Sequence, residues 1–370
     1  MSSAVASALH GLVGPLVGLN RRLVVCEPCA GISAWKAICD SVGLVWPPED
    51  CYEFDAALGA FWRKHLGTRA QSMHLDKAGD INFINCNDLE SEVEVLVAGP
   101  PCQPWSPSGK RGGEYDDRSL VYLQVISMIV HYAHKGSLLF FLVENSSLLA
   151  KTAFLRDVMQ YLSVAIPWFV VDYVQQDLQA VFPHSRSLLM QGIGNTDLGL
   201  LCAKQQHNLE QYKGFVKRDL LDGHGFEIAV LEVDRAPGNL YGSRYYRDVC
   251  PALRTSGGSL FVLSTGDLDQ EWRDQEFHRP LTAQERLVLQ GHSGELYYDF
   301  YRSSDCVKAT GNAFHTLALA MMMQPLCQAA MDAGKLQSSN QQAPLQPNEV
   351  ATLCSVADAG TQAFKKLRRI

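Results

Sequence analysis

Several features are scarce or missing in this 370-residue sequence. No apolar run reaches the ~18 residues that a membrane-spanning helix needs, so we expect no membrane partner. The first 20 residues contain no Lys or Arg, so we expect no secretory signal peptide. Positive charge is also scarce, because 32 Lys and Arg against 39 Asp and Glu give a net charge of −7. This balance argues against broad adhesion to nucleic acid and leaves local basic patches for such contact.

Hydrophobic residues make up 47% of the chain, which is ample for a packed core and excludes a wholly disordered protein. The 11 cysteines are scattered through a long sequence, so we expect reduced thiols in an intracellular compartment. The basic stretch 365–369 is equally consistent with a nuclear address and with a solvated end. We therefore expect the nucleus for a eukaryotic source and the cytoplasm for a bacterial one.

Short apolar runs alternate with stretches of helical period, which predicts an α/β fold with a largely parallel sheet. The expected strands are 22–26, 93–98, 138–143, 169–174 and 187–191, and the expected helices are 33–42, 120–132 and 155–163. The length favours two units. We expect residues 20–194 with 279–334 to form the larger unit, 195–278 a smaller one, and 335–370 a linker and tail.

The most informative segment is 96–106, where an apolar strand runs into a Pro-rich loop. Pro100 and Pro101 restrict the loop, so Cys102 is held and becomes a candidate nucleophile, although a lone cysteine after a strand is usually just a small buried residue. A second apolar strand ends in Glu144 and Asn145. Because neighbouring strands of an open α/β sheet meet one crevice at their carboxyl ends, Cys102 and Glu144 are expected to meet there.

This pair resembles the cytosine-5 methyltransferase family, which has a Pro-Cys-Gln loop and a Glu-Asn-Val strand end. Here they read Pro101-Cys102-Gln103 and Glu144-Asn145-Ser146, and the family's other motifs follow in the usual order over about 23–324. The resemblance implies a Rossmann-like S-adenosylmethionine methyltransferase sheet with a smaller target-recognition domain. It also implies that Cys102 adds to carbon 6 of cytosine while Glu144, a carboxyl with a raised pKa, protonates ring nitrogen 3.

The resemblance further implies an S-adenosylmethionine site. The segment 27–35 is similar to the family's glycine-rich turn, but Cys29 replaces a phenylalanine and Ser33-Ala34 replaces two glycines. Glu53 lies 22 residues after Gly31, near the spacing at which nucleotide-binding folds place an acid on the ribose. The implied cofactor contacts are Cys29, Ala30, Gly31, Glu53, Phe54, Asp80, Ile81, Gly99, Pro100, Asn312 and Ala313. Cys26 and Cys29 have metal-ligand spacing, but no second Cys-x-x-Cys exists and we expect no metal.

A stacked cytosine is unreachable, so the resemblance implies duplex DNA with a flipped-out base as the partner. Nucleic-acid contacts are implied for Lys110, Arg111, Arg118 and Arg279, although the first three are also consistent with solvated surface charges. Arg186 is implied to reach the flipped base, while another alignment puts Leu188 there. The implied catalytic residues are thus Cys102, Glu144, Asn145 and Arg186.

The resemblance implies a DNA (cytosine-5-)-methyltransferase, and two alternatives stay open. A tRNA-specific branch of the family shares the core motifs, although its Cys-Phe-Thr triplet is absent here. The altered first and eighth motifs are also consistent with a catalytically weakened DNA-binding homologue. The target sequence and the oligomeric state stay open.

Overall fold

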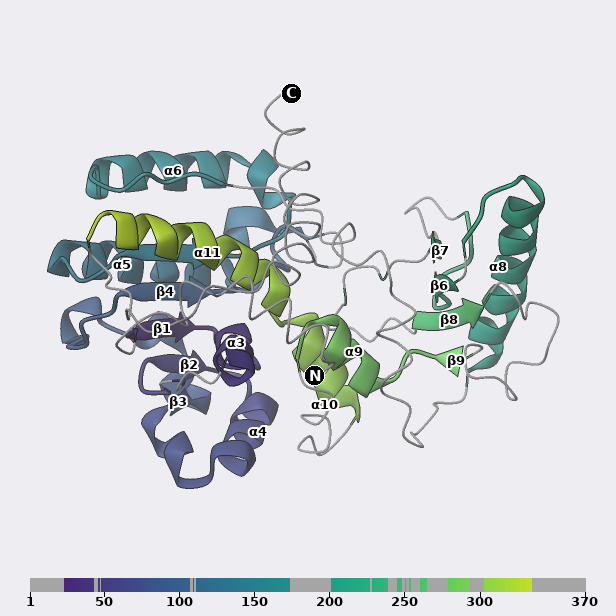
Figure 1. Cartoon of the computed structure of the whole chain (residues 1–370), viewed down its shortest axis with the longest axis horizontal. Coiled ribbons are helices and arrows are strands. Elements are labelled where there is room, and N and C mark those ends of the chain that lie inside the picture. Colours follow the sequence, from purple (N-terminus) through teal and green to yellow (C-terminus); the bar gives the residue numbers. More distant parts are fainter. Residues whose placement is uncertain are drawn as a thin grey trace, which may run out of the picture.

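The computed structural model describes two groups of elements, each built around its own sheet (Figure 1). The described residues are 23–42, 46, 48–106, 109, 111–173, 201–226, 228–238, 245–247, 250, 253, 260–264, 279–292 and 303–334. Within these residues no helix is long and apolar enough to cross a membrane.

The first sheet has the strand order β3-β2-β1-β4-β5, and all four neighbouring pairs are parallel. Its strands are β1 (Val25–Pro28), β2 (Cys51–Glu53), β3 (His74–Leu75), β4 (Val95–Ala98) and β5 (Phe140–Val143). The chain moves outward from β1 to β3 and then returns to the other side of β1. The carboxyl ends of β1 and β4 therefore form a topological switch point, where open α/β sheets bind ligands.

Both faces of this sheet are buried, as its continuous apolar strands predict. Along β1 and β4, Val25, Val95 and Val97 face one core while Cys26 and Leu96 face the other. The first core is completed by α3 (Ala34–Val42), α4 (Ala56–Leu66) and α11 (Thr316–Asp332), and the second by α5 (Ser119–Lys135) and α6 (Ala153–Ala165). Short 3-10 helices cover 67–72, 76–79, 81–83, 86–88, 113–115 and 149–151. The predicted α/β fold is confirmed.

The strand predicted at 169–174 is wrong within its described part, because residues 169–173 contain no strand. The amide of Phe169 donates to the Ile166 carbonyl (2.9 Å), which closes a turn after α6. Phe169 then packs on Phe141 with ring centroids 6.1 Å apart, while the next side chain, Val170, is 97% exposed. The strand predicted at 187–191 lies outside the described residues.

The second sheet is antiparallel, with the order β7-β6-β8-β9. Its strands are β6 (Ile228–Glu232), β7 (Tyr245–Arg247), β8 (Leu260–Ser264) and β9 (Arg279–Pro280), and α8 (Ala203–Leu221) packs on it. Leu209, Tyr212 and Val216 are the buried residues of α8 in that core. β9 begins one residue after the expected end of the smaller unit at 278.

After β9 the chain returns to the first sheet through α9 (Ala283–Leu289), α10 (Ser303–Gly311) and α11. Thr282 caps α9, since its hydroxyl accepts from the Glu285 amide (3.1 Å) and the Glu285 carboxylate accepts from the Thr282 amide (2.9 Å). α10 contacts α4, and α11 contacts α3. Segments some 250 residues apart are thereby brought together beside the switch point (Figure 1).

Candidate active site

The loop after β4 holds Cys102 in a fixed position. The amides of Trp105 and Ser106 both donate to the Cys102 carbonyl, at 3.0 and 2.8 Å. The Trp105 ring is buried against Tyr122 and Phe154, with centroids 5.7 and 5.2 Å away. The thiol side chain itself is half-buried, so it is both held and accessible.

The end of β5 places Glu144 and Asn145 against this loop. The Glu144 amide donates to the Ala98 carbonyl (2.9 Å), which continues the β4–β5 ladder. A Cβ added at Gly99 would lie 3.7 Å from Glu144 Oε2, so the carboxylate lies over Gly99. Asn145 Nδ2 donates to the Pro100 carbonyl (3.1 Å). The structure thus brings Glu144 and Asn145 to the loop that carries Cys102.

The electrostatics of the pair suit proton donation by the carboxyl. The Glu144 side chain is exposed at the surface, yet partial desolvation of its carboxyl by the surrounding protein raises its pKa to about 7. Burial raises the pKa of the Cys102 thiol, and the negative charge of Glu144 raises it further, while the positive charge of Arg118 opposes both. Near neutral pH, Glu144 is therefore partly protonated and Cys102 is mainly a thiol.

A pocket opens at the carboxyl ends of β1 and β4, at the switch point. Its lining residues are Glu27, Cys29, Ala30, Ala34, Val97, Gly99, Asn312 and Phe314. Gly31 lies in the turn with φ +58°, and a Cβ there would lie 3.8 Å from the Asn312 carbonyl oxygen. The pocket therefore lies between the turn after β1 and the segment after α10. This is where the predicted cofactor contacts Gly31 and Asn312 lie.

Ser33 stands in this turn where the resembling family has a glycine, and its backbone has the left-handed φ of +51°. Hydrogen bonds hold this conformation. The Ser33 hydroxyl donates to the buried carboxylate of Glu27 (2.8 Å) and accepts from the Lys36 amide (2.8 Å), which caps α3. The indole of Trp46 also donates to Glu27 (2.9 Å). Burial raises the pKa of Glu27, and these donors oppose that shift.

Glu53 is held at the end of β2 by two amides. Its Oε2 accepts from Gly31 (2.7 Å) and its Oε1 from Asp55 (2.7 Å). Burial raises the pKa of this carboxyl to about 7, and the two amides oppose the shift. Next to it, the Phe54 ring is 61% exposed, which leaves its face available to a flat ligand.

The third segment, 79–81, packs closely against β2. A Cβ at Gly79 would lie 2.4 Å from the Glu53 carbonyl oxygen, so this position admits only glycine. The carboxylate of Asp80 accepts from the Asn82 amide (3.1 Å). Ile81 is buried in the core, so its side chain does not reach the pocket and only its backbone is available to a ligand.

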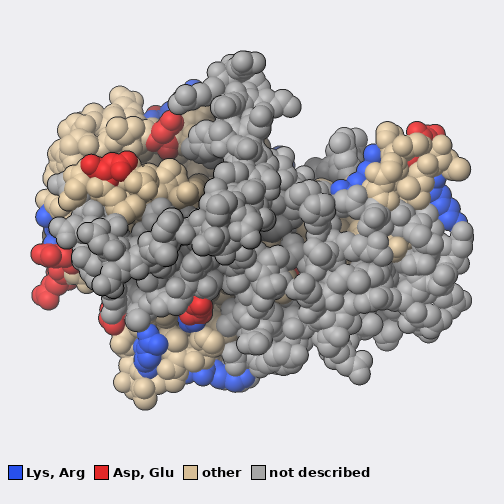
Figure 2. All heavy atoms as spheres, viewed as in Figure 1, with Lys and Arg blue, Asp and Glu red and all other residues tan. Residues whose placement is uncertain are grey.

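The predicted nucleic-acid contacts are only partly described. Arg118 donates to Asp116 through Nε (2.8 Å) and Nη2 (2.6 Å), and Arg111 is exposed with φ +55°. Lys110 and Arg186 lie outside the described residues, as does the side chain of Arg279. On the face drawn in Figure 2, the coloured Lys and Arg residues lie in separate groups.

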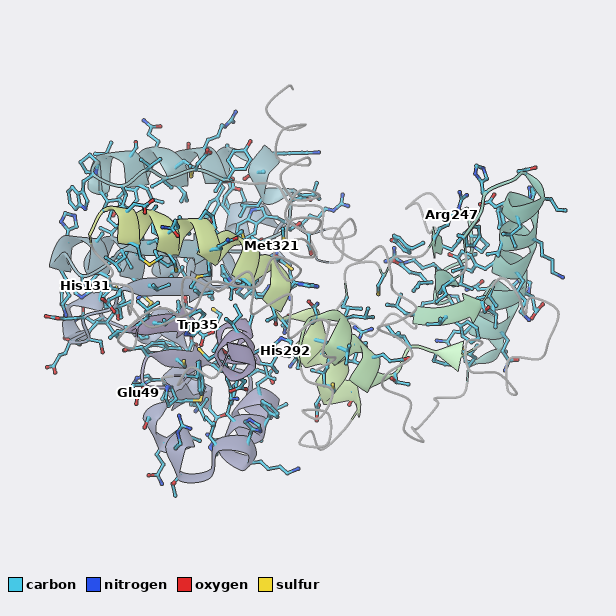
Figure 3. The ribbon with its side chains drawn as sticks, in the orientation of Figure 1. Trp35, Glu49, His131, Arg247, His292 and Met321 are labelled. Carbon is cyan, nitrogen blue, oxygen red and sulfur yellow. The ribbon has the colours of Figure 1, made fainter. Side chains whose placement is uncertain are left out.

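Sequence reasoning missed four residues that line the pocket, namely Glu27, Ala34, Val97 and Phe314. Glu27 and Ala34 flank the Ala-Gly turn, and Phe314 follows Asn312 by two residues, so proximity to the predicted motifs was the available signal. Trp35 of α3 and Met321 of α11, both labelled in Figure 3, contribute to the core behind the turn.

Residues 66–164 match the family model described as C-5 cytosine-specific DNA methylase, and this stretch includes Cys102 and Glu144. The predicted resemblance to the cytosine-5 methyltransferases is confirmed by this match. Curated relatives include the Type II methyltransferase M.NgoPII of Neisseria gonorrhoeae, 36% identical over 69 residues, which are 19% of each chain. M.BsuFI of Bacillus subtilis is 35% identical over 85 residues, 23% of this chain and 20% of the relative. The matched segment thus spans about a fifth of these relatives' length.

Solved structures resemble the chain over most of its length. The S. pombe Dnmt2 methyltransferase superposes with a TM-score of 0.51 and 14% identity, covering 83% of this chain and 99% of that one. A candidate DNA modification methyltransferase from an E. coli prophage gives a TM-score of 0.51 and 13% identity, covering 84% and 100%. At this identity the likeness concerns the fold, and it confirms the Rossmann-like methyltransferase architecture.

Proposed function

We propose that this chain, whose residues 66–164 match the family model of C-5 cytosine-specific DNA methylases, transfers a methyl group from S-adenosylmethionine to carbon 5 of cytosine in DNA. The observation that carries the proposal is that Glu144, at the end of β5, lies close enough to act electrostatically on the Cys102 thiol in the loop after β4, beside a pocket at the β1–β4 switch point. A nucleophile, a neutral acid and a ligand pocket at one sheet edge are what this chemistry needs.

The residues around the pocket fit S-adenosylmethionine. Glu53 presents a buried carboxylate for ribose hydroxyls, and the exposed ring of Phe54 offers a face to adenine. Glu27 lines the inner end as a buried carboxylate suited to an ammonium group. Gly31 and Gly99 keep the backbone open to close approach. When bound, the cofactor supplies an electrophilic methyl group.

The residues of the chain prepare the base for that methyl group. Cys102 Sγ adds to carbon 6 of a cytosine placed between the loop and Glu144, while Glu144 gives a proton to ring nitrogen 3. Carbon 5 then becomes an enamine carbon and a nucleophile. Once carbon 5 has gained the methyl group, its proton passes to a water molecule, the carbon 5–carbon 6 double bond re-forms and the Cys102 thiolate leaves. Glu144 takes back the proton from ring nitrogen 3. Asn145 donates a hydrogen bond to the Pro100 carbonyl, and this bond holds the Cys102 loop in place beside Glu144.

We assign target recognition to the second unit, at about 195–278, and place the base in a cleft between it and the catalytic sheet. Supporting this, β6 and β8 form a separate core with α8, and the exposed side of α8 carries Lys217 and Arg218. Arg118 lies within electrostatic reach of Cys102 and is suited to a phosphate next to the target base.

Covalent trapping tests the proposal. Full-length protein, cofactor and a duplex containing 5-fluorocytosine should give a denaturation-resistant adduct, and Cys102→Ala should abolish it. Cys202→Ala, which removes the exposed thiol of the residue just before α8, is the matched control and should react like the wild type. An adduct formed by Cys102→Ala would refute the nucleophile assignment.

The same assay separates the alternative functions. Fluorinated tRNA in place of the duplex tests the tRNA substrate, and stronger trapping there would overturn the choice of DNA. DNA binding without an adduct, in the presence of bound cofactor, would identify a catalytically weakened homologue instead.

A further inference from the structure

An ion pair connects α10 to the rim of the cofactor pocket. Lys308 Nζ on α10 contacts Asp55 Oδ2, 253 residues earlier in the sequence. The Asn312 amide donates to the Lys308 carbonyl (3.2 Å), so the pocket-lining Asn312 lies one helical turn after this lysine. Lys308 therefore links the returning helix to β2 at a point next to the pocket.

Asp55 has three roles at that point. Its Oδ1 accepts from the amides of Ala57 (3.0 Å) and Leu58 (3.3 Å), which caps α4. Its own amide donates to Glu53 Oε1 (2.7 Å), and its Oδ2 receives Lys308. A displacement of Asp55 would thus displace one of the two amides that orient Glu53.

We propose that Lys308 is a positioning residue for the cofactor: through Asp55 it fastens α10 beside the pocket and keeps Glu53 oriented to accept the ribose hydroxyls. The inference rests on the proposed function, because it requires S-adenosylmethionine to bind in this pocket. Lys308 itself need not touch the ligand.

The charges around Glu53 determine how its pKa should change when Lys308 is replaced. Burial raises the pKa of Glu53 to about 7, the negative charge of Asp55 raises it further, and the positive charge of Lys308 lowers it. From the β1 turn, the Cys29 thiol also faces Glu53, and burial keeps it neutral by raising its pKa. Beyond Cys29 lies the carboxyl of Asp80. Lys308 is thus the cation that favours an ionised Glu53 among the described groups that act on it.

Ribose hydroxyls donate to an ionised carboxylate, so affinity should fall as the pH drops through the pKa of Glu53. Without Lys308 that pKa rises, and the loss of affinity should begin at a higher pH. The ion pair is partly solvated, since the Lys308 side chain is 47% exposed, so the effect is moderate. We expect Lys308→Met to weaken cofactor binding about two- to fivefold at pH 7.

The test is titration calorimetry of the full chain with S-adenosylmethionine between pH 6 and 9. Lys308→Arg keeps the charge and should bind within about twofold of the wild type. Asp55→Asn keeps the helix cap but removes the charge, and the double variant should bind no more weakly than Lys308→Met alone. Lys213→Met removes a lysine paired with Glu210 on α8 and is the matched control.

Thermal unfolding of each variant shows that the chain is folded. Equal affinities and equal pH profiles for the wild type and Lys308→Met would overturn the assignment, as would additive effects of the two single variants. A folded wild type that does not bind S-adenosylmethionine would instead refute the proposed function, and the role of Lys308 with it.

Discussion

Replacement of Glu144 by Gln tests the proposed acid through the pH dependence of adduct formation. Glutamine keeps the size and polarity of the side chain but has no proton to give to ring nitrogen 3. General acid catalysis by a positioned side chain typically contributes about 10²- to 10⁴-fold. We expect Glu144→Gln to slow the reaction by that factor at pH 7.

The magnitude follows from the surroundings of Glu144. With a pKa of about 7, half of the carboxyls are protonated at pH 7. At the ordinary value of 4.5, about 0.3% would be protonated. Limited hydration at the site therefore raises the amount of neutral acid more than a hundredfold at neutral pH.

The productive form needs Glu144 protonated and Cys102 ionised, so the rate follows the product of the two fractions. Since the pKa of Cys102 is raised and lies above that of Glu144, the rate should rise tenfold per pH unit up to about pH 7 and then level off. Above pH 7, loss of the acid cancels the gain of thiolate. In Glu144→Gln only the thiol titrates, so the rate should keep rising and the deficit should narrow about tenfold per pH unit.

The assay is the initial rate of adduct formation on a 5-fluorocytosine duplex at saturating cofactor, from pH 6 to 9. The free energy of unfolding of each variant provides the control. A carboxyl whose pKa is raised in the folded state destabilises that state as the pH rises from its unfolded pKa to its folded pKa. Glu144→Gln should consequently be at least as stable as the wild type at pH 8. Parallel pH profiles, or equal rates at pH 7, would refute the acid role.

Three further outcomes are expected. Asp116→Asn frees Arg118 from its carboxylate partner and should tighten duplex binding several-fold at low salt in a filter-binding assay; weaker binding would contradict a phosphate contact by Arg118. Gly79→Ala forces a Cβ against the Glu53 carbonyl and should cost about 1–3 kcal/mol in urea unfolding, and an unchanged midpoint would count against this close approach. Ser33→Ala removes a helix cap at a left-handed φ and should cost about 1–2 kcal/mol, whereas Ser33→Gly should cost less; the reverse order would contradict the strained geometry.

The location of the proposed pair, Cys102 and Glu144, was predictable because the sequence signals for it are local. The apolar runs at 93–98 and 138–143 are continuous rather than alternating, as strands buried on both faces must be, and they correspond to β4 and β5. Parallel pairing then requires their carboxyl ends to meet at one edge. The positions of Cys102 and Glu144 follow from that topology alone.

The hydrogen bonds and contacts that stabilise unusual backbone conformations were less predictable. The replaced glycine at Ser33 hints at a left-handed backbone, but the hydrogen bond that the Ser33 hydroxyl donates to Glu27 depends on burial of that carboxylate by the fold. The run 169–174 has strong strand propensity, yet residues 169–173 follow a turn instead. Propensity there is outweighed by tertiary packing of Phe169 on Phe141.

The pocket at the β1–β4 edge takes Glu27 and Ala30 from near the start of the described chain and Asn312 and Phe314 from near its end. During translation, the residues that form the first part of this pocket are therefore synthesised roughly 280 residues before those that form the last part. Synthesis proceeds at ≈ 5–20 residues per second. Ligand capture should follow only after α10 has emerged from the exit tunnel. An N-terminal fragment ending at residue 300 would contain all five parallel strands but would lack α10 and α11, which border the pocket and cover one face of the sheet.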